Sequence, residues 1–326
     1  MSNVVSPRTV DVTRLTGGSV VRFLQSYAIA VMIVALMVAL SVMSDSFLTA
    51  QNLLNILNQN APLAILASAM TLVIICGGFD LSVGAIFAVA GVTAAWLALR
   101  VHPLAGLAAA PIVGMVLGYA NGLIITQLRL HSFLATLATG LMFRGMAILI
   151  TGGTLIPVRL AEFTWLGRGR IGPVYIAILV MIAFAIILMV LLNRTTLGRK
   201  MLAVGGNEEA AILSGIRTNR VKIVTFAIAG LAAGLAAAIS VSRISMGQAT
   251  AGAGLELEAI AAVIIGGTSI YGGKGAIWRS IAGVIMLALI NNGFNILNAD
   301  PFFKDFTTGL IIVMAVAISA SGNRKR

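Results

Sequence analysis

The sequence is short of charge, cysteine and histidine. Of its 326 residues only 10% are charged, whereas 59% are hydrophobic, and the mean hydropathy is +1.04. A soluble domain carries roughly 25% charged residues, so this chain has too little polar surface for a water-soluble enzyme. One cysteine (Cys76) excludes a disulfide framework or a cysteine zinc site, and two histidines (His102 and His131) leave too few ligands for a transition-metal site. These absences indicate a polytopic membrane protein.

Long apolar runs take the place of charge. A helix needs about 20 apolar residues to cross the hydrocarbon core of a bilayer. The sequence predicts an all-α membrane protein with about ten transmembrane helices, at about 27–43, 60–77, 81–99, 103–126, 132–151, 173–192, 221–242, 256–272, 277–297 and 303–320. An eight-span version with re-entrant segments near residues 76–84 or 266–276 fits almost as well.

The net charge of +12 sets the predicted orientation. Lys and Arg lie in short gaps between apolar runs, without the basic face and stacking aromatics of a nucleic-acid binder. Most fall on one side of the membrane when both termini are cytoplasmic, as the positive-inside rule requires. We therefore expect a cytoplasmic tail at 1–26, a transmembrane domain at 27–320 and a basic cytoplasmic tail at 321–326.

Residues 49–58 leave two interpretations open. Their leucines and isoleucine favour one face while Asn and Gln lie elsewhere, a pattern typical of a short interfacial helix on the outer side. The same residues also fit an extension of the second span.

The longest cytoplasmic loop, residues 193–222, differs from the other loops. It contains Asn207-Glu208-Glu209-Ala210-Ala211 and then Gly215. Asn207 can cap a short helix, the two acidic residues suit its first turn, and Gly215 suits a left-handed stop. A helix with small residues on one side is typical of a segment that docks in another protein's groove, although an ordinary solvated helix has the same pattern.

Polar residues also interrupt the spans themselves. Asp80 lies between two apolar runs; if the helix breaks there, Asp80 or Ser82 caps the next half, although a plain N-cap at a cytoplasmic turn explains Asp80 equally well. Arg144 must face the protein interior or a wet cavity, as a substrate contact or as the partner of a carbonyl or of Glu162. Uncharged amides suit either a path for polyols or interhelical hydrogen bonds; they are Asn121, Asn291, Asn292 and Asn295.

Two internal echoes suggest repeats. Residues 80–89, which begin Asp80-Leu81-Ser82, are similar to residues 256–263, which begin Glu256-Leu257-Glu258, with two residues skipped. These segments open the third and eighth spans, which run in opposite directions, as an inverted five-plus-five repeat predicts. A competing echo pairs Gly77-Gly78 with Gly266-Gly267 in parallel sense.

The glycine-rich stretch 267–275 resembles a phosphate-binding loop but is not one. The pattern G-x-x-x-x-G-K-[ST] fails, because Thr268 occupies the first Gly position and Gly275 follows Lys274. We expect no nucleotide site and no cofactor in this chain, so the energy for any transport must come from a partner or a gradient.

Several motifs together resemble one family. The E-A-A-x-x-x-G pattern at 209–215 looks like the coupling loop of ABC importer permeases, and residues 77–85 resemble the G-G-x-D-L-S-V-G signature of the ribose, xylose, arabinose and galactose branch. Four further blocks resemble the same family: Gly254 to Ala261, Gly266-Gly267-Thr268-Ser269, Gly272-Gly273-Lys274-Gly275 and Phe143-Arg144-Gly145. The first of these blocks has Glu258 at a position where the family commonly has an aspartate. The likeness runs from about residue 45 to residue 320 in the family's order.

The resemblance implies a permease subunit of a bacterial inner-membrane importer that translocates a monosaccharide, with a ribose-like pentose as the first expectation and a hexose or polyol next. Its implied partners are a cytoplasmic ATPase that uses ATP-Mg and docks on residues 207–216, a periplasmic sugar-binding protein, and a second permease, identical or paralogous. We expect seven glycines at helix breaks and turns: Gly77, Gly78, Gly84, Gly266, Gly267, Gly272 and Gly273. We expect nine polar residues along the translocation path: Asp80, Ser82, Asn121, Arg144, Glu256, Glu258, Asn291, Asn292 and Asn295. The alternative is a gradient-driven sugar transporter or channel, whereas a membrane enzyme lacks any catalytic motif.

Overall fold

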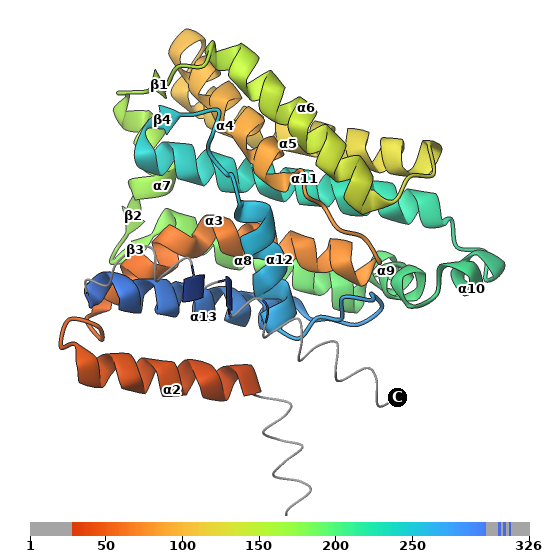
Figure 1. The fold of residues 1–326 in the computed structure, drawn as a ribbon. Coiled ribbons are helices and arrows are strands. Elements are labelled where there is room, and N and C mark those ends of the chain that lie inside the picture. The colour runs from red at the N-terminus through yellow and green to blue at the C-terminus, as the bar shows by residue number, and fades with distance from the viewer. Residues whose placement is uncertain (1–27, 298–305, 308, 311–312, 314–326) are drawn as a thin grey trace, which may run out of the picture.

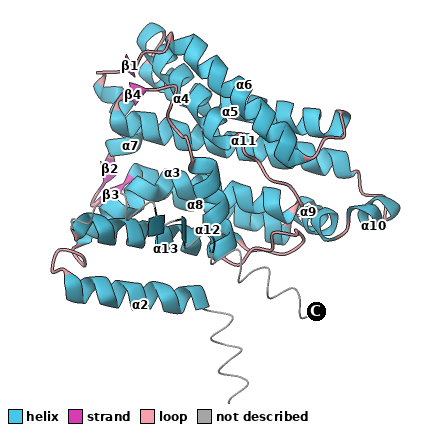
Figure 2. Cartoon of the chain, in the orientation of Figure 1, coloured by secondary structure: helices cyan, strands magenta, loops and turns pink. Residues whose placement is uncertain are grey.

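The computed structural model describes residues 28–297, 306–307, 309–310 and 313, and most of this part is helical (Figures 1 and 2). The all-α prediction is confirmed. The predicted tails at 1–26 and 321–326 and most of the last predicted span, 303–320, lie outside the described residues, so the position of the two termini stays a prediction.

The long helices follow the predicted spans closely. They are α2 (Ala28–Met43), α3 (Ala50–Ile75), α4 (Val83–Arg100), α5 (Pro103–Gln127), α6 (Ser132–Thr151), α8 (Ile176–Arg194), α11 (Thr218–Ile244) and α13 (Ile277–Ile296). Within the described part of the chain, seven of them, all except α2, are long and apolar enough to cross a membrane. The total number of spans stays a prediction.

The structure decides one open alternative and overturns one predicted span. Residues 50–58 are the first turns of α3, so they extend the second span and do not form a separate interfacial helix, and Thr49 caps α3 by accepting a hydrogen bond from Asn52 N at 3.3 Å. The predicted span at 256–272 is instead the short helix α12 (Leu255–Ile265), of 11 residues. At 1.5 Å per residue, the length of α12 is only about half the thickness of a bilayer core.

The remaining elements are short and lie at the two ends of the bundle (Figure 1). One end carries α9 (Thr196–Gly206) and α10 (Glu208–Leu213); we expect this end on the cytoplasmic side because of the arginines and lysines around these helices, and we name the two ends accordingly. The other, outer end carries η1 (Ala161–Thr164), α7 (Trp165–Arg168) and two antiparallel pairs: β1 (Ile156–Pro157) with β4 (Met246–Gly247), where Ile156 faces Gly247, and β2 (Arg170–Ile171) with β3 (Val174–Tyr175), where Arg170 faces Tyr175.

The core forms around α3 and α11. Almost every side chain of α3 from Ala61 onward is buried, and α11 packs on α5 with glycines on both helices. A Cβ added at Gly118 would lie 2.3 Å from the Phe226 carbonyl oxygen, and one at Gly230 would lie 2.1 Å from that of Gly114. Small residues let the two backbones approach to this distance, which is how helices associate in a membrane.

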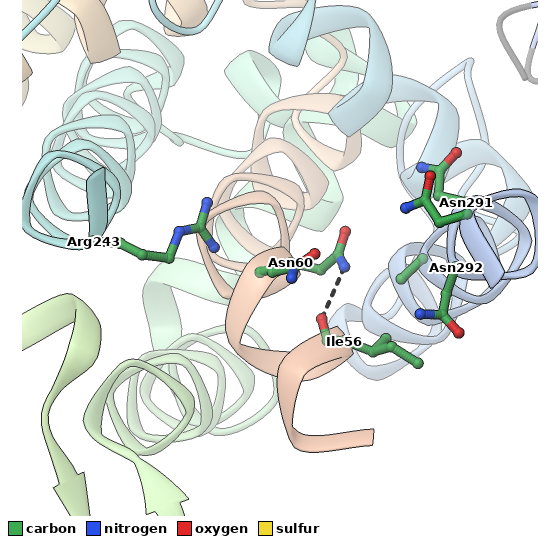
Figure 3. Close-up of a pocket in the computed structure, with 8 residues that line it drawn as sticks. Ile56, Asn60, Arg243, Asn291 and Asn292 are labelled. Atoms are coloured by element: carbon green, nitrogen blue, oxygen red, sulfur yellow. Dashed lines mark hydrogen bonds between the residues drawn. The ribbon is translucent and has the colours of Figure 1, made fainter. Parts of the chain in front are cut away.

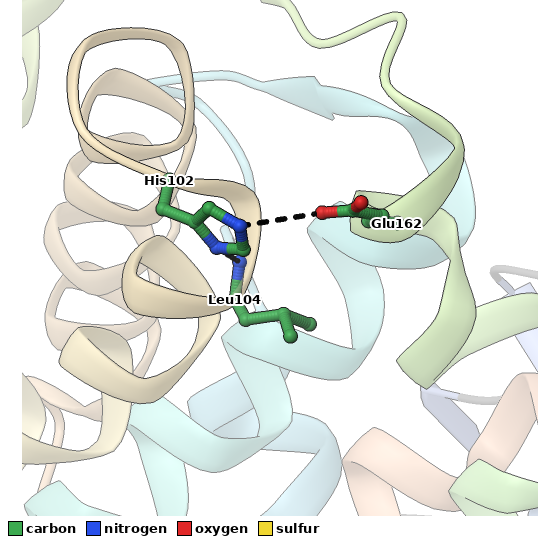
Figure 4. Close-up of polar contacts among 3 residues, drawn as sticks. All are labelled: His102, Leu104 and Glu162. Atoms are coloured by element: carbon green, nitrogen blue, oxygen red, sulfur yellow. Dashed lines mark hydrogen bonds and ion pairs between the residues drawn. The ribbon is translucent and has the colours of Figure 1, made fainter.

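His102 has a structural role at the outer end (Figure 4). Its Nδ1 accepts a hydrogen bond from Leu104 N at 3.2 Å and so caps α5, while its Nε2 lies 3.5 Å from the Glu162 carboxylate on η1. Glu162, one of the partners predicted for Arg144, therefore pairs with His102 instead.

Candidate functional site

A buried polar group occupies the break between α3 and α4. Asp80 is fully buried, and its Oδ1 accepts hydrogen bonds from Ser82 N at 2.9 Å and Ser82 Oγ at 2.5 Å. Asn121 on α5 donates to Ser82 Oγ at 2.6 Å. The structure therefore brings together three residues that the sequence singled out separately, and the predicted break is confirmed.

Capping at this break differs from the prediction. Ser82 is the N-cap residue of α4, but neither its side chain nor that of Asp80 makes a capping hydrogen bond to the helix. The unwound backbone is held by hydroxyls of α6, since Phe79 N donates to Ser132 Oγ at 3.1 Å and Leu81 N donates to Thr136 Oγ1 at 3.0 Å. Asp80 is buried among helices and not on an exposed cytoplasmic turn.

The first turn of α12 meets the first turn of α4 (Figure 1). A Cβ at Gly84 would lie 2.2 Å from Glu256 Oε2 and 2.3 Å from the Gly252 carbonyl oxygen, so only glycine fits there. The two segments of the inverted echo thus form two helix N-termini that face each other, each with a carboxylate beside it. A carboxylate near a helix N-terminus is favourable because it opposes the positive end of the helix dipole.

Several polar atoms of this junction are available for further hydrogen bonds. Among the described residues, Asp80 Oδ2, Asn121 Oδ1 and Glu256 Oε2 are buried without a hydrogen-bond partner. Such atoms raise the free energy of the folded state unless water or a ligand reaches them. No group of three or more His, Cys, Asp or Glu residues within the described ranges is arranged to hold a metal ion.

Arg144 fastens the loop that leads into α12. Its Nη1 donates to the carbonyl oxygens of Ala249 and Ala251, each at 2.7 Å. Of the roles left open by the sequence, the carbonyl partner is therefore confirmed. Glu258 is exposed on α12.

The predicted asparagines of α13 lie elsewhere. Asn291, Asn292 and Asn295 line a cavity of about 430 Å³ at the outer end, together with residues of α3 and α11 that include Asn60 and Arg243 (Figure 3). Gln59, Asn60 and Arg243 were not among the predicted site residues. Two adjacent amides in an apolar run were the signal for the first two, whereas Arg243 lies one position beyond the predicted span 221–242 and is in fact the penultimate residue of α11.

The predicted glycine turns end α3 and α12 in the same way. Gly77 lies just after the end of α3, and Gly267 lies just after the end of α12. Both glycines have a φ of +83°. The hydrogen bonds also match: Gly77 N to Ile74 O and Gly78 N to Val73 O in one helix, Gly267 N to Ile264 O and Thr268 N to Val263 O in the other. The parallel echo is therefore a shared helix ending, with Gly77 equivalent to Gly267 and not to Gly266. Gly266 itself packs on α13: a Cβ added to Gly266 would lie 2.5 Å from the Arg279 carbonyl oxygen.

These two helix endings converge on α9. Gly273 N donates to Ile75 O at 2.8 Å, which joins the end of α3 to the turn after α12. A Cβ at Gly205 of α9 would lie 1.7 Å from Ile75 O and 2.8 Å from Gly273 N, and one at Gly272 would lie 2.6 Å from Gly205 O. Gly205 therefore packs between the two helix endings, and it belongs to α9, the helix that precedes α10.

The short helix α10 has the predicted caps. Asn207 Oδ1 accepts from Ala210 N at 2.9 Å, and Gly215 has a φ of +80° with the paired hydrogen bonds of a left-handed stop. Glu208 also pairs with Lys222 of α11 at 2.6 Å, which fastens α10 to the bundle.

The outward surface of α10 is more apolar than expected. Ala211 is buried, whereas Glu209, Ala210, Ile212 and Leu213 are exposed, Leu213 to 88%. Ile212 and Leu213 were not among the predicted site residues, although two large apolar side chains in a polar loop were a usable signal. A cavity of about 720 Å³ beside the helix is lined by basic residues that include Arg129, Arg217, Arg220 and Lys222.

Comparison with known proteins gives one consistent group. A family model described as "Branched-chain amino acid transport system / permease component" matches residues 52–316. The ribose import permease protein RbsC of Escherichia coli K12 is 40% identical over 295 residues, 88% of this chain and 91% of that protein, and RbsC of Bacillus subtilis is 41% identical over 286 residues, 87% and 89%. The D-allose transport system permease protein AlsC of Escherichia coli K12 is 36% identical over 290 residues, 88% and 89%. No solved structure matches.

Proposed function

Because this chain belongs to the family of branched-chain amino acid transport system permease components, a multi-pass family of the bacterial inner membrane, we propose that it is the permease of an ABC importer for a monosaccharide. A ribose-like pentose is the first candidate, since the RbsC proteins of Escherichia coli K12 and Bacillus subtilis are 40% and 41% identical to this chain, and a hexose or polyol is next. The permease has two partners of other kinds, a periplasmic sugar-binding protein and a cytoplasmic ATPase that hydrolyses ATP-Mg. It pairs with a second copy of itself or with a paralogous permease.

The observation that carries this proposal is α10. It is capped at both ends, joined to α11 through Glu208 and Lys222, and presents Ile212 and Leu213 to solvent at the cytoplasmic end. Exposed aliphatic residues on a rigid, short helix suit a groove in a partner. A gradient-driven transporter has no use for such a helix.

The contacts of α9 supply a route from that helix to the transport path. Movement of α10 carries α9 with it, and Gly205 presses on the joined endings of α3 and α12. Because α12 begins beside Glu256 at the junction with α4, a displacement of its far end shifts the two facing helix N-termini. Alternating access then follows from rocking these broken helices between outward-open and inward-open arrangements.

The test is co-expression of the tagged chain with its neighbouring genes, followed by purification in mild detergent and ATP-driven sugar uptake in vesicles. We expect an ATPase to co-purify with the wild-type chain and to be lost from a Leu213→Glu variant. Leu155→Glu is the matched control, because Leu155 is an exposed leucine in the loop after α6 at the outer end. A Gly215→Arg variant is less specific, since Gly215 also needs its left-handed conformation. Uptake that continues without ATP and survives Leu213→Glu would replace this proposal by the secondary-transporter alternative.

A further inference from the structure

The outer cavity is built from amides. It lies between α3, α11 and α13, with a volume of about 430 Å³. Its polar lining consists of five carboxamide side chains and one guanidinium group: Gln59, Asn60, Asn291, Asn292, Asn295 and Arg243. The other two lining residues are Ile56 and Ala288. The lining therefore has no carboxylate and no aromatic ring.

Part of this lining is fixed by the protein, and part is available to a ligand. Asn292 exchanges two hydrogen bonds with Asn52 of α3, at 3.1 and 3.2 Å, which fixes α13 against α3. Arg243 Nη1 donates to Asn58 O at 3.1 Å, and the guanidinium points toward Asn60 across the cavity (Figure 3). Among the described residues, Asn291 Oδ1 is buried without a hydrogen-bond partner. The cavity thus has fixed walls and unused hydrogen-bonding groups.

The chemistry of the lining matches a neutral polyhydroxylated molecule. Each amide both donates and accepts, as a sugar hydroxyl does, and the remaining N–H groups of Arg243 add donors. The volume falls within the range of about 300–1,000 Å³ that holds small ligands. Without an aromatic face for the sugar ring, the contacts stay weak, as a transport step requires if the ligand is to leave.

The inward side of the cavity is closed. A second, apolar pocket shares Ile56, Asn60 and Ala288 with it and continues toward the cytoplasmic end between α3, α8 and α13. Its volume is only about 20 Å³, and its deeper lining includes Met181, Ile281 and Val284. A sugar that enters from outside therefore stops against aliphatic side chains in this conformation.

From these observations we propose that the amide-lined cavity between α3, α11 and α13 is an outer holding site, where a neutral monosaccharide waits before the inward side opens. The inference rests on the proposed function for the kind of ligand and adds the place and the residues. Asn291 and Arg243 contact the sugar, and Asn292 positions α13.

The experiment uses cysteine protection in the full importer. Cys76 is buried and is the sole cysteine of the sequence, so an Asn295→Cys variant places one accessible thiol on the cavity rim. Labelling with a membrane-impermeant maleimide from the outer side is timed with and without D-ribose, D-allose or L-arabinose. Val101→Cys is the control, since Val101 is 68% exposed at the outer end and does not line the cavity.

We expect at least one of these sugars to slow labelling at position 295 about threefold or more, and none to slow it at position 101. Inorganic phosphate at equal osmolarity should have no effect; equal protection by phosphate would show an anion site and overturn the proposal. ATP-driven uptake is measured in the same vesicles. Uptake without protection at position 295 by the transported sugar would refute the holding site and leave the proposed function standing. Protection without ATP-driven uptake would support the site and count against the importer.

Substitution of the contact residue gives an independent test. Asn291→Leu should raise the sugar concentration for half-maximal uptake roughly 3- to 10-fold, the loss expected for one or two hydrogen bonds to a neutral ligand. Asn291→Gln should reverse part of this rise in the half-maximal concentration. Gln127 is an exposed amide at the opposite end of the bundle, so Gln127→Leu should leave the half-maximal concentration unchanged. An Asn291→Leu chain that purifies in normal yield and transports with unchanged concentration dependence would overturn the proposal.

Discussion

Gly84 and Glu256 lie in van der Waals contact although 172 residues separate them: a Cβ on Gly84 would sit 2.2 Å from Glu256 Oε2. Gly84 is in the first turn of α4 and Glu256 in the first turn of α12, so the contact joins two helix beginnings. Only glycine at position 84 allows the two helix beginnings to approach this closely.

The first prediction concerns this contact. Gly84→Ala should destabilise the protein by about 3 kcal/mol, because neither the Glu256 carboxylate nor the Gly252 carbonyl can move aside freely. Thermal unfolding in detergent measures the loss. Gly145→Ala on α6 is the control, since nothing lies within 4 Å of a Cβ there. Adding Glu256→Ala should not restore stability, because the Gly252 carbonyl at 2.3 Å remains; full restoration would show that the contact is misplaced.

Arg144 is expected to hold the loop before α12. Arg144→Gln removes a charged donor from two carbonyl oxygens at 2.7 Å and should cost roughly 2–3 kcal/mol. Limited proteolysis should then cut the loop at residues 248–254 sooner than in the wild type. Arg100→Gln at the outer end, where Arg100 stacks on Trp96 at 4.3 Å, serves for comparison. Equal protease resistance of both variants would exclude a fastening role for Arg144.

Gly205 is expected to transmit movement between α10 and the broken helices. Gly205→Ala should abolish ATP-driven uptake, because its methyl group would collide with Ile75 O at 1.7 Å and Gly273 N at 2.8 Å and push α9 away. The adjacent Gly206→Ala has nothing within 4 Å and should transport normally. Uptake assays and co-purification of the ATPase are run on both. Normal uptake by Gly205→Ala would remove α9 from the route.

Asn207 is expected to stabilise α10 through its cap. Asn207→Ala removes the hydrogen bond to Ala210 N and should weaken the helix by about 1 kcal/mol. ATPase recovery in pull-downs should fall, while Asn207→Asp, which keeps the capping oxygen, should restore it. Hydrogen exchange at residues 208–213 reports the helix directly, and unchanged exchange in Asn207→Ala would contradict the prediction.

Local rules predicted most of the architecture. Apolar length located the spans, and the Asn207 cap and Gly215 stop defined α10 to within a residue, because capping depends on neighbours in sequence. The span at 256–272 failed because its apolar composition hides the helix ending at Gly266 and Gly267. The length of an apolar run does not reveal a turn within it when the turn consists of small residues such as glycine.

The sequence by itself determined that this chain is a helical membrane protein, where most of its long helices lie and which short helix its longest loop contains. Those features follow from hydrophobic burial and from hydrogen bonds between residues a few positions apart. Only the tertiary structure decided that the polar residues divide into two groups, with Asp80, Ser82, Asn121 and Glu256 at the helix junction and Asn291, Asn292 and Asn295 at an outer cavity with Arg243. Helix packing brings Asn121 to Ser82 across 39 positions and Glu256 to the first turn of α4 across more than 170, and close approach of glycines, which no local pattern encodes, sets the distances between these elements.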